Sequence, residues 1–255
     1  MRLPAFVKHT ILRTVKRLGY VLIRDDFQLS TDDLNDNQPS FRRLCERVQP
    51  YTMTSVERLY AMHSATEYIV KAGIPGDIVE CGVWRGGSMM MAALSLLALG
   101  DTSRRLVCFD TFAGHPRPDP KRDGELYYRE WAQQKITDKS SHWNEVSVEE
   151  VFQNISSTGY PMDKVKLVKG MVEETLADNL PSQIALLRLD TDWYESTAQE
   201  LHHLYPLLAD RGVLIIDDYG CMAGARQAVD EYFKEKEIAL LLHRVDSDGR
   251  MAVKT

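Results

Sequence analysis

Five short apolar runs, each followed by a polar turn and a helical segment, constrain this chain more than any other feature. The runs are DIVECGV, RLVCFD, KVKLVKG, IALLRLD and GVLIIDD, all between residues 77 and 218. They are continuously apolar rather than alternating, which is typical of parallel strands that are covered on both faces. Helical segments between the runs begin near Ser88, Val148, Thr197 and Ala223. This alternation predicts an α/β fold with a mostly parallel sheet.

Two further segments extend this core. Residues 238–255 contain IALLLHRV, DSDG and RMAVKT, which predict a β-hairpin around an Asp-Gly turn and bring the sheet to seven strands. Residues 54–73 predict a helix with Thr54 or Ser55 as N-cap and Gly73 at its end. The segment 113–147 is long, charged and proline-bearing, and we expect it to be a mobile lid, because such a loop in a compact domain usually serves the binding site.

The first 50 residues differ from the rest. Apolar residues recur at helical spacing within residues 1–24, with basic residues on other faces, so an amphipathic helix is predicted. We expect this helix to pack on the domain or on a second subunit, which favours a homodimer; contact with an anionic membrane surface is the alternative. Residues 25–40 are acidic and turn-rich, typical of a linker or loose cover. The expected division is therefore 1–50 as helix and linker or lid, and 51–255 as the main domain.

Composition narrows the class of protein. The 255 residues are 44% hydrophobic and 27% charged, as in globular proteins. The net charge is −6 with both signs dispersed, which argues against a nucleic-acid binder. The four cysteines are far apart and lack CxxC spacing, so we expect reduced core residues. No apolar run has membrane-spanning length, and charges interrupt any signal-peptide core, so a cytoplasmic location is predicted.

The glycine-rich turn after the first run, ECGVWRGGS at residues 80–88, predicts a cofactor site. Open α/β sheets bind ligands at the carboxyl ends of their strands. The spacing misses the GxGxxG pattern of dinucleotide-binding folds, and Glu80 would repel a pyrophosphate but suits an ammonium group. Asp110, which ends the second run, could accept hydrogen bonds from ribose hydroxyls. A nucleoside with a cationic amino-acid arm fits both acids, and S-adenosylmethionine is such a molecule.

Acidic residues also end the fourth and fifth runs, at Asp190 and Asp192 and at Asp217 and Asp218. Adjacent strands lie about 4.8 Å apart, so Asp190 should meet the Asp217–Asp218 pair. Unpaired carboxylates at that range raise one another's pKa, and a divalent cation would remove the conflict. An all-oxygen ligand set favours Mg²⁺, with Mn²⁺ or Ca²⁺ as alternatives.

Two other interpretations of these acids stay open at this point. Asp192 or Asp218 could instead be the N-cap of a helix. Residues 190–192 also form a DxD that could hold Mn²⁺ and a nucleotide diphosphate in a glycosyltransferase, although this leaves Glu80 and the glycine turn unexplained. With a cation beside a methyl donor, the metal would lower the pKa of an acceptor hydroxyl and a carboxylate would take its proton.

Several motifs in order along the chain resemble one known family. They are TMTSVERL, IPGDIVECGVWRGGS, CFDTFAG, LDTDWYEST and IIDDYG…GARQAVDEYF, from Thr52 to Phe233. Together they resemble the macrocin O-methyltransferase (TylF-type) family. The resemblance implies a class I methyltransferase fold, which is Rossmann-like with helices on both faces of the sheet. It also implies that S-adenosylmethionine and Mg²⁺ act on a hydroxyl, often of a deoxysugar in a glycosylated natural product; a catechol acceptor is compatible too.

The resemblance also implies a role for particular residues in binding the donor. Those near its methionine arm would be Met53, Ser55, Glu80, Gly82 and Ser88. Asp110 would hold the ribose, and the backbone at Met171 and Val172 would flank the adenine.

For the metal, the resemblance implies Asp190, Asp217 and Asp218 as ligands, with Asp190 also the proton acceptor and Asp192 the second candidate for that base. The family's usual EGLP is AGHPRP in this chain, which puts His115 where an apolar residue is expected. We expect a solvated loop histidine there; an acid or base near the substrate is the alternative.

Overall fold

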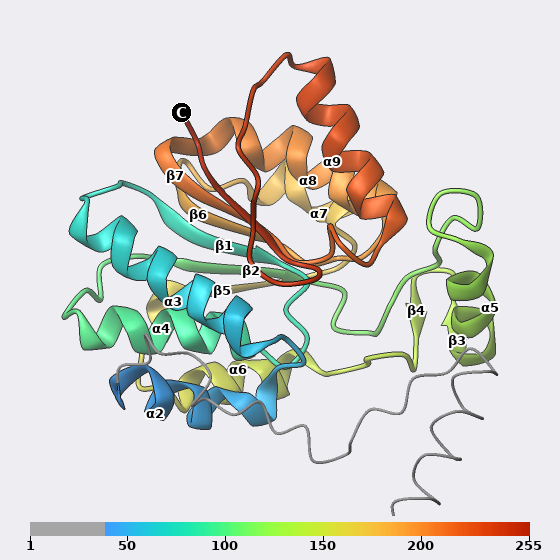
Figure 1. Cartoon of the computed structure of the whole chain (residues 1–255). Helices are drawn as coiled ribbons and strands as arrows, with labels where there is room; N and C mark the ends of the chain where they lie inside the picture. Colours follow the sequence, from blue (N-terminus) through green and yellow to red (C-terminus); the bar gives the residue numbers. More distant parts are fainter. Residues whose placement is uncertain (1–38) are drawn as a thin grey trace, which may run out of the picture. The chain divides into compact units, whose positions relative to one another are not determined.

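A seven-stranded sheet forms the centre of the computed structural model, which describes residues 39–255 (Figure 1). In spatial order the strands are β5 (Val165–Lys169), β2 (Leu106–Asp110), β1 (Asp77–Cys81), β6 (Ile184–Leu189), β7 (Leu208–Ile216), β9 (Arg250–Val253) and β8 (His243–Arg244). Pairing is parallel from β5 to β7, whereas β9 is antiparallel to both of its neighbours. The predicted seven-stranded, mostly parallel sheet and its C-terminal hairpin are confirmed. The helix predicted within residues 1–24 lies outside the described residues.

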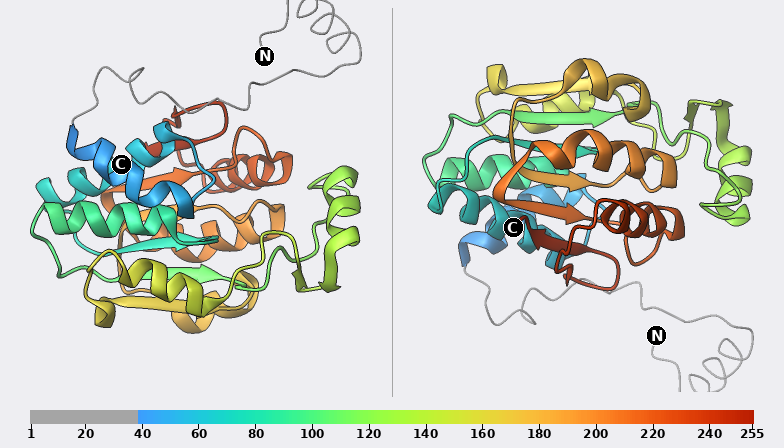
Figure 2. Two further views of the ribbon diagram at one scale, coloured as in Figure 1. Left: turned by 90° about the horizontal axis from the view of Figure 1, so that it is seen from below. Right: turned by 90° about the horizontal axis from the view of Figure 1, so that it is seen from above.

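Helices cover both faces of the sheet, as predicted (Figures 1 and 2). On one face lie α2 (Pro39–Val48), α3 (Val56–Lys71), α4 (Gly87–Ala98) and α6 (Val148–Ser156). On the other lie α7 (Val172–Asn179), α8 (Tyr194–Leu204) and α9 (Ala223–Glu235). Single 3₁₀ turns occur at η2 (Gln49–Tyr51), η3 (Met162–Lys164) and η4 (Tyr205–Leu207). None of the helices in residues 39–255 combines the length and apolarity that crossing a bilayer requires.

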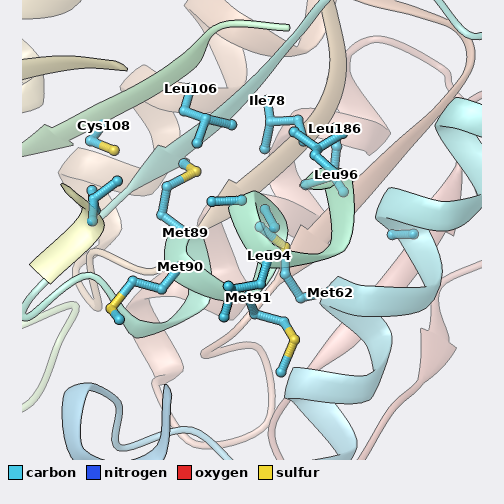
Figure 3. Packing of buried hydrophobic residues seen from close by; sticks show 14 of the residues in the cluster. Met62, Ile78, Met89, Met90, Met91, Leu94, Leu96, Leu106, Cys108 and Leu186 are labelled. Carbon is cyan, nitrogen blue, oxygen red and sulfur yellow. The ribbon is translucent and has the colours of Figure 1, made fainter. Parts of the chain in front are cut away.

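Side chains along each strand alternate between the two faces, and this decides where the polar residues point. Ile78 and Leu186 pack with the buried methionines of α4 (Figure 3), whereas Val79 and Leu187 pack under α7, α8 and α9. Continuing the alternation by two residues puts Glu80 and Arg188 on the α4 face. These residues are also cross-strand neighbours in the register of β1 and β6.

Two elements differ from the sequence prediction. Helix α2 begins at Pro39, inside the predicted linker, and buries Phe41, Cys45 and Val48, which recur at helical spacing. The core therefore includes residues that precede the expected boundary at residue 51. Helix α8 begins at Tyr194 rather than near Thr197, because the carboxylate of Asp123 accepts a hydrogen bond from the Tyr194 backbone N–H at 2.8 Å.

The segment 113–147 is folded rather than an open loop. It contains α5 (Glu125–Gln134) and a small sheet of β3 (Lys135–Thr137) and β4 (Ser140–Ser141), and it lies beyond the carboxyl ends of the parallel strands (Figure 2). Its two ends are joined by backbone hydrogen bonds from His115 to Trp143 and from Ser141 to Ala113. Trp131 is buried within it. This position is compatible with a cover over the site; its mobility stays a prediction.

Candidate active site

A cavity of about 340 Å³ lies at the carboxyl ends of the parallel strands. Most of the predicted site residues line it: Met53, Gly82, Ser88, Asp110, Met171, Val172, Asp190, Asp192, Asp217 and Asp218. The lid segment contributes His115, Pro116, Trp143 and Asn144. The lining does not include Ser55 or Glu80. One cavity therefore joins the glycine turn, the acidic cluster and the lid.

The glycines of the turn are needed because two chain segments cross there at very short range. Gly82 has φ +80°, and a Cβ on it would lie 1.9 Å from the backbone oxygen of Asp190. At Gly87, which begins α4, a Cβ would lie 2.6 Å from the backbone oxygen of Tyr51. Only glycine permits both approaches. The turn thus brings the ends of β1 and β6 and the segment before α3 together around the cavity.

Asp110 holds this turn in place. Its Oδ2 accepts hydrogen bonds from the backbone N–H groups of Val83 and Trp84 at 2.7 and 3.0 Å, and its Oδ1 accepts one from Phe112 at 2.8 Å. The carboxylate still lines the cavity. Oδ2 already accepts two hydrogen bonds, so Oδ1, whose other neighbour is the Thr111 hydroxyl at 3.4 Å, is the oxygen with room for a ligand. The predicted ribose contact stays a prediction, to which the structure adds a role in fixing the glycine turn.

Arg188 lies at the centre of the acidic residues, and the sequence reasoning missed it. Its Nη1 donates to Glu80 at 2.5 Å and to Asp190 at 2.6 Å, and its Nη2 donates to Asp217 at 2.6 Å. Its side chain is 4% exposed. Glu80, which we expected to face the cofactor, is thus buried behind this arginine with one oxygen bonded to it. Burial raises the pKa of Glu80 to about 7, against the lowering effect of Arg188.

A second arginine, Arg58 on α3, neutralises the other side of the cluster. It forms ion pairs with Asp217 and, at 2.9 Å, with Asp246 in the turn between β8 and β9. Ser55 donates to the same Asp246 at 2.6 Å and accepts from the Arg58 backbone N–H as N-cap of α3. The predicted N-cap is confirmed, but Ser55 lies outside the cavity lining. Both oxygens of Asp217 are therefore bonded to arginines.

A group of three acids lies beside these arginines, and among the described residues its only arginine contact is the pair of Asp190 with Arg188. Asp190, Asp192 and Asp218 bring carboxylate oxygens within 4.8 Å of one another. Burial is the main cause that raises the pKa of Asp192 to about 7, and the negative charge of Asp190 is the second. Burial, followed by the charge of Asp192, also raises the pKa of Asp218 well above its usual range. Asp218 Oδ2 is buried without a hydrogen-bond partner. An oxygen-rich group with surplus negative charge and an unpartnered oxygen fits a hard divalent cation.

His115 is not a solvated loop residue, so that expectation is wrong. Its side chain is 16% exposed, and its ring lies 4.8 Å from that of Trp143 and 5.4 Å from that of Trp193. Its Nδ1 is 3.3 Å from Asp192 Oδ2, and its Nε2 is 3.0 Å from the side-chain nitrogen of Asn144. Burial lowers the pKa of His115 to about 4, so it is neutral at pH 7.

The missed residues differ in how visible they are in the sequence. Arg188 is a charged residue inside an otherwise apolar run, and a charge in a buried strand requires a partner. That signal was available. The involvement of Arg58, Trp143 and Asn144 depends on contacts between distant parts of the chain, for which the sequence gives no local signal.

The strand order and this cavity are those of a class I S-adenosylmethionine-type methyltransferase. The solved structure of the O-methyltransferase NovP superimposes with a TM-score of 0.73, is 31% identical, and covers 80% of this chain and 82% of its own. An 8-demethyl-8-(2,3-dimethoxy-α-L-rhamnosyl)-tetracenomycin-C 4'-O-methyltransferase from Streptomyces olivaceus is 33% identical over 93% of this chain and 90% of its own length. The demethyldecarbamoylnovobiocin O-methyltransferase of Streptomyces niveus is 34% identical over 78% and 74%, respectively.

The model of the macrocin O-methyltransferase (TylF) family matches residues 9–253. The chain belongs to this family, and it is an S-adenosylmethionine-dependent O-methyltransferase. The resemblance noted from the motifs is thereby confirmed. The alternative interpretation of residues 190–192 as the DxD of a glycosyltransferase is wrong.

Proposed function

We propose that this enzyme methylates a sugar hydroxyl of a glycosylated natural product, and that it requires Mg²⁺ or Mn²⁺ for the reaction. One observation carries the proposal: a single cavity is lined both by the glycine turn and by an oxygen-rich acidic group. A methyl donor and an acceptor hydroxyl beside a cation would therefore share one space. Holding both reactants in one orientation removes much of the entropic barrier to a bimolecular reaction.

The donor end of the cavity is formed by backbone and small side chains. Gly82 and Ser88 flank the place where the methionine arm would lie, and Met171 and Val172 begin α7 beside the expected adenine. When bound, S-adenosylmethionine supplies a methyl group on a positively charged sulfur. Asp110 keeps the turn in the conformation that leaves this space open.

The cation would be held by Asp190, Asp192 and Asp218. Their convergence and the unpartnered Asp218 Oδ2 support this choice. The sequence favoured Asp217 as a ligand, but two arginines already neutralise that carboxylate. When bound, the cation would lower the pKa of the acceptor hydroxyl.

The proton of the hydroxyl would pass to Asp192 rather than to Asp190. Asp190 shares its Oδ2 with Arg188, whereas no arginine pairs with Asp192 among the described residues. A general base has to reach the acceptor hydroxyl, and Asp192 lines the same cavity as the other two acids. As the proton leaves, the oxygen forms a bond to the methyl carbon, and the electron pair of the breaking carbon–sulfur bond stays on sulfur.

A sugar is favoured as acceptor because the tetracenomycin relative acts on a rhamnosylated compound and covers nearly the whole chain. Three aromatic rings cluster near the acids, those of Tyr127, Trp143 and Trp193, with centroids 5.9–6.5 Å apart, and Trp143 lines the cavity. The Trp143 ring could pack against the apolar face of a sugar or against an aglycone. A catechol would also bind a cation through two oxygens, and the experiment must therefore separate these acceptors.

The experiment has a binding part and a turnover part. Calorimetry should show that S-adenosylmethionine binds without a metal, and Mn²⁺ titrations should show a cation site in the same protein. The enzyme, isotope-labelled S-adenosylmethionine and Mg²⁺ are then incubated with the demethylated tetracenomycin glycoside, demethyldecarbamoylnovobiocin, a simple catechol and an extract of the producing cells. Mass spectrometry should find label on a sugar hydroxyl and should lose it with a chelator. Label on the catechol alone, or turnover unaffected by chelation, would refute the proposal.

The homodimer, the membrane contact as its alternative, and the cytoplasmic location stay predictions. The expected division into 1–50 and 51–255 fits only up to residue 38, because Pro39–Val48 packs in the core of the second part; we propose that the residues before α2 cover or assemble and that the rest is catalytic. Light scattering of the full chain and of a chain that begins at residue 39 would test the contribution of the first part to assembly.

A further inference from the structure

The side chains of Asn144 and His115 form a chain of polar contacts that ends at Asp192. The Asn144 side-chain nitrogen is 3.0 Å from His115 Nε2, and His115 Nδ1 is 3.3 Å from Asp192 Oδ2. Asn144 and His115 belong to the two ends of the lid segment, whereas Asp192 follows β6. This contact therefore connects the lid directly with the acid that we propose as the base.

Asn144 determines which nitrogen of the neutral imidazole carries the proton. An amide nitrogen can only donate, so His115 Nε2 must accept, and the ring proton is then on Nδ1. Nδ1 lies 3.3 Å from Asp192 Oδ2, which is an ion-pair distance and not a formed hydrogen bond; catalytic hydrogen bonds that are long or poorly aligned in a free enzyme often tighten when substrate binds. The opposite tautomer would turn a lone pair of Nδ1 toward the carboxylate and repel it.

The surroundings hold the ring of His115 in this orientation. The rings of Trp143 and Trp193 pack against it, and the backbone N–H of His115 donates to the backbone oxygen of Trp143 at 3.0 Å. Asn144 adopts φ +55°, in the left-handed region that asparagine tolerates better than most residues. The histidine and the asparagine are therefore fixed relative to each other by backbone as well as by side chains.

We propose that His115 is a positioning residue, kept as its Nδ1–H tautomer by Asn144, which orients the carboxylate of Asp192 toward the acceptor hydroxyl. The inference rests on the proposed function, because the orientation matters to the reaction only if Asp192 accepts the proton. The contact makes the orientation of Asp192 depend on the packing of His115 and Asn144 at the two ends of the lid segment.

The tautomer is measured without any acceptor. In full-length protein labelled with ¹⁵N-histidine, the His115 signals are assigned by their loss in His115→Asn. At pH 7 we expect the Nδ1–H tautomer in the wild type and a shift toward Nε2–H in Asn144→Gly, since glycine accepts the positive φ but has no amide. An Nε2–H tautomer in the wild type, or identical spectra of the wild type and Asn144→Gly, would overturn the proposal.

Kinetics test the consequence, with the compound from the acceptor panel that is turned over. His115→Leu should lower kcat roughly 10- to 100-fold, the effect of one hydrogen bond to a charged group, and leave the KM for S-adenosylmethionine unchanged. His115→Asn should recover most of the loss, because its amide nitrogen is attached to the same carbon as Nδ1. Equal losses in both variants would mean that only ring packing matters and would reject the positioning role. His142→Leu, which changes an exposed histidine of the same segment, is the matched control and should resemble wild type.

Asp192→Asn separates this inference from the proposed function. If Asp192→Asn is inactive and His115→Leu is fully active, only the positioning role fails. If Asp192→Asn keeps wild-type turnover, the proposed base fails, and the role of His115 fails with it.

Discussion

Replacing Arg188 by methionine should test the electrostatic framework of the site most directly. Arg188 bonds three carboxylates at 2.5–2.6 Å, and two of them, Glu80 and Asp217, are themselves buried. Methionine keeps the length of the side chain but removes the charge and every hydrogen bond. Asp217 keeps its ion pair with Arg58, whereas Glu80 keeps no cation among its described partners.

The expected loss of stability follows from what the variant leaves behind. Removing one partner of a buried ion pair typically costs about 3–5 kcal/mol, because the other charge stays buried without compensation. For a chain of this size, that corresponds to a drop in Tm of roughly 6–20 °C. The surface pair of Arg105 with Asp77 is the control: Arg105 is 49% exposed, and Arg105→Met should cost less than about 1 kcal/mol.

The pH dependence of the stability loss shows whether the uncompensated charge of Glu80 causes it. Burial already raises the pKa of Glu80 to about 7, and removal of Arg188 raises it further. A carboxyl group whose pKa is higher in the folded state destabilises that state as pH rises from the unfolded pKa to the folded one. The deficit of Arg188→Met relative to wild type should thus be larger at pH 8 than at pH 5, as measured by urea unfolding with circular dichroism. A deficit no larger than that of Arg105→Met, or one that does not change with pH, would refute this account of the cluster.

Three further predictions concern the cation, the glycine turn and a buried acid. Asp218→Asn should weaken Mn²⁺ binding at least about tenfold in titrations followed by electron paramagnetic resonance, since it removes one of three anionic ligands; Asp230→Asn on the surface of α9 should not. Gly82→Ala should destabilise the protein by more than Gly100→Ala in urea unfolding, because both have positive φ but only Gly82 meets backbone atoms; equal losses would mean that the close approach is unimportant. Burial raises the pKa of Glu200 well above 4.5, so ionised Glu200 costs stability as pH rises above that value. Glu200→Gln should therefore gain stability relative to wild type between pH 5 and pH 8, and a constant difference would contradict the raised pKa.

The architecture could be predicted from the sequence because it depends on local patterns that are read along the chain. Continuous apolar runs separated by helical segments determined the parallel sheet, and the rule that ligands bind at the carboxyl ends of strands placed the cavity. The fold of the lid segment could not be predicted in this way. Its polar, proline-bearing composition is typical of a loop, and the burial of Trp131, whose Nε1–H donates to the backbone oxygen of His115 at 3.2 Å, depends on tertiary structure.

The acidic cluster shows why counting charges at strand ends is insufficient. Gathered carboxylates do not all require a bound cation, because two of the positive charges belong to the protein itself. They are Arg188 on β6, the cross-strand neighbour of Glu80, and Arg58 on α3. Strand register places Arg188 opposite Glu80, and register is a property of paired strands rather than of either segment alone. The acids whose charge these arginines do not fully neutralise are Asp192, Asp218 and Asp190, of which Asp190 shares one oxygen with Arg188. All three line the same cavity as the lid residues. Asp190, Asp192 and Asp218 would hold a cation in the cavity that the glycine turn and Trp143 also line, and there it would lower the pKa of an acceptor hydroxyl.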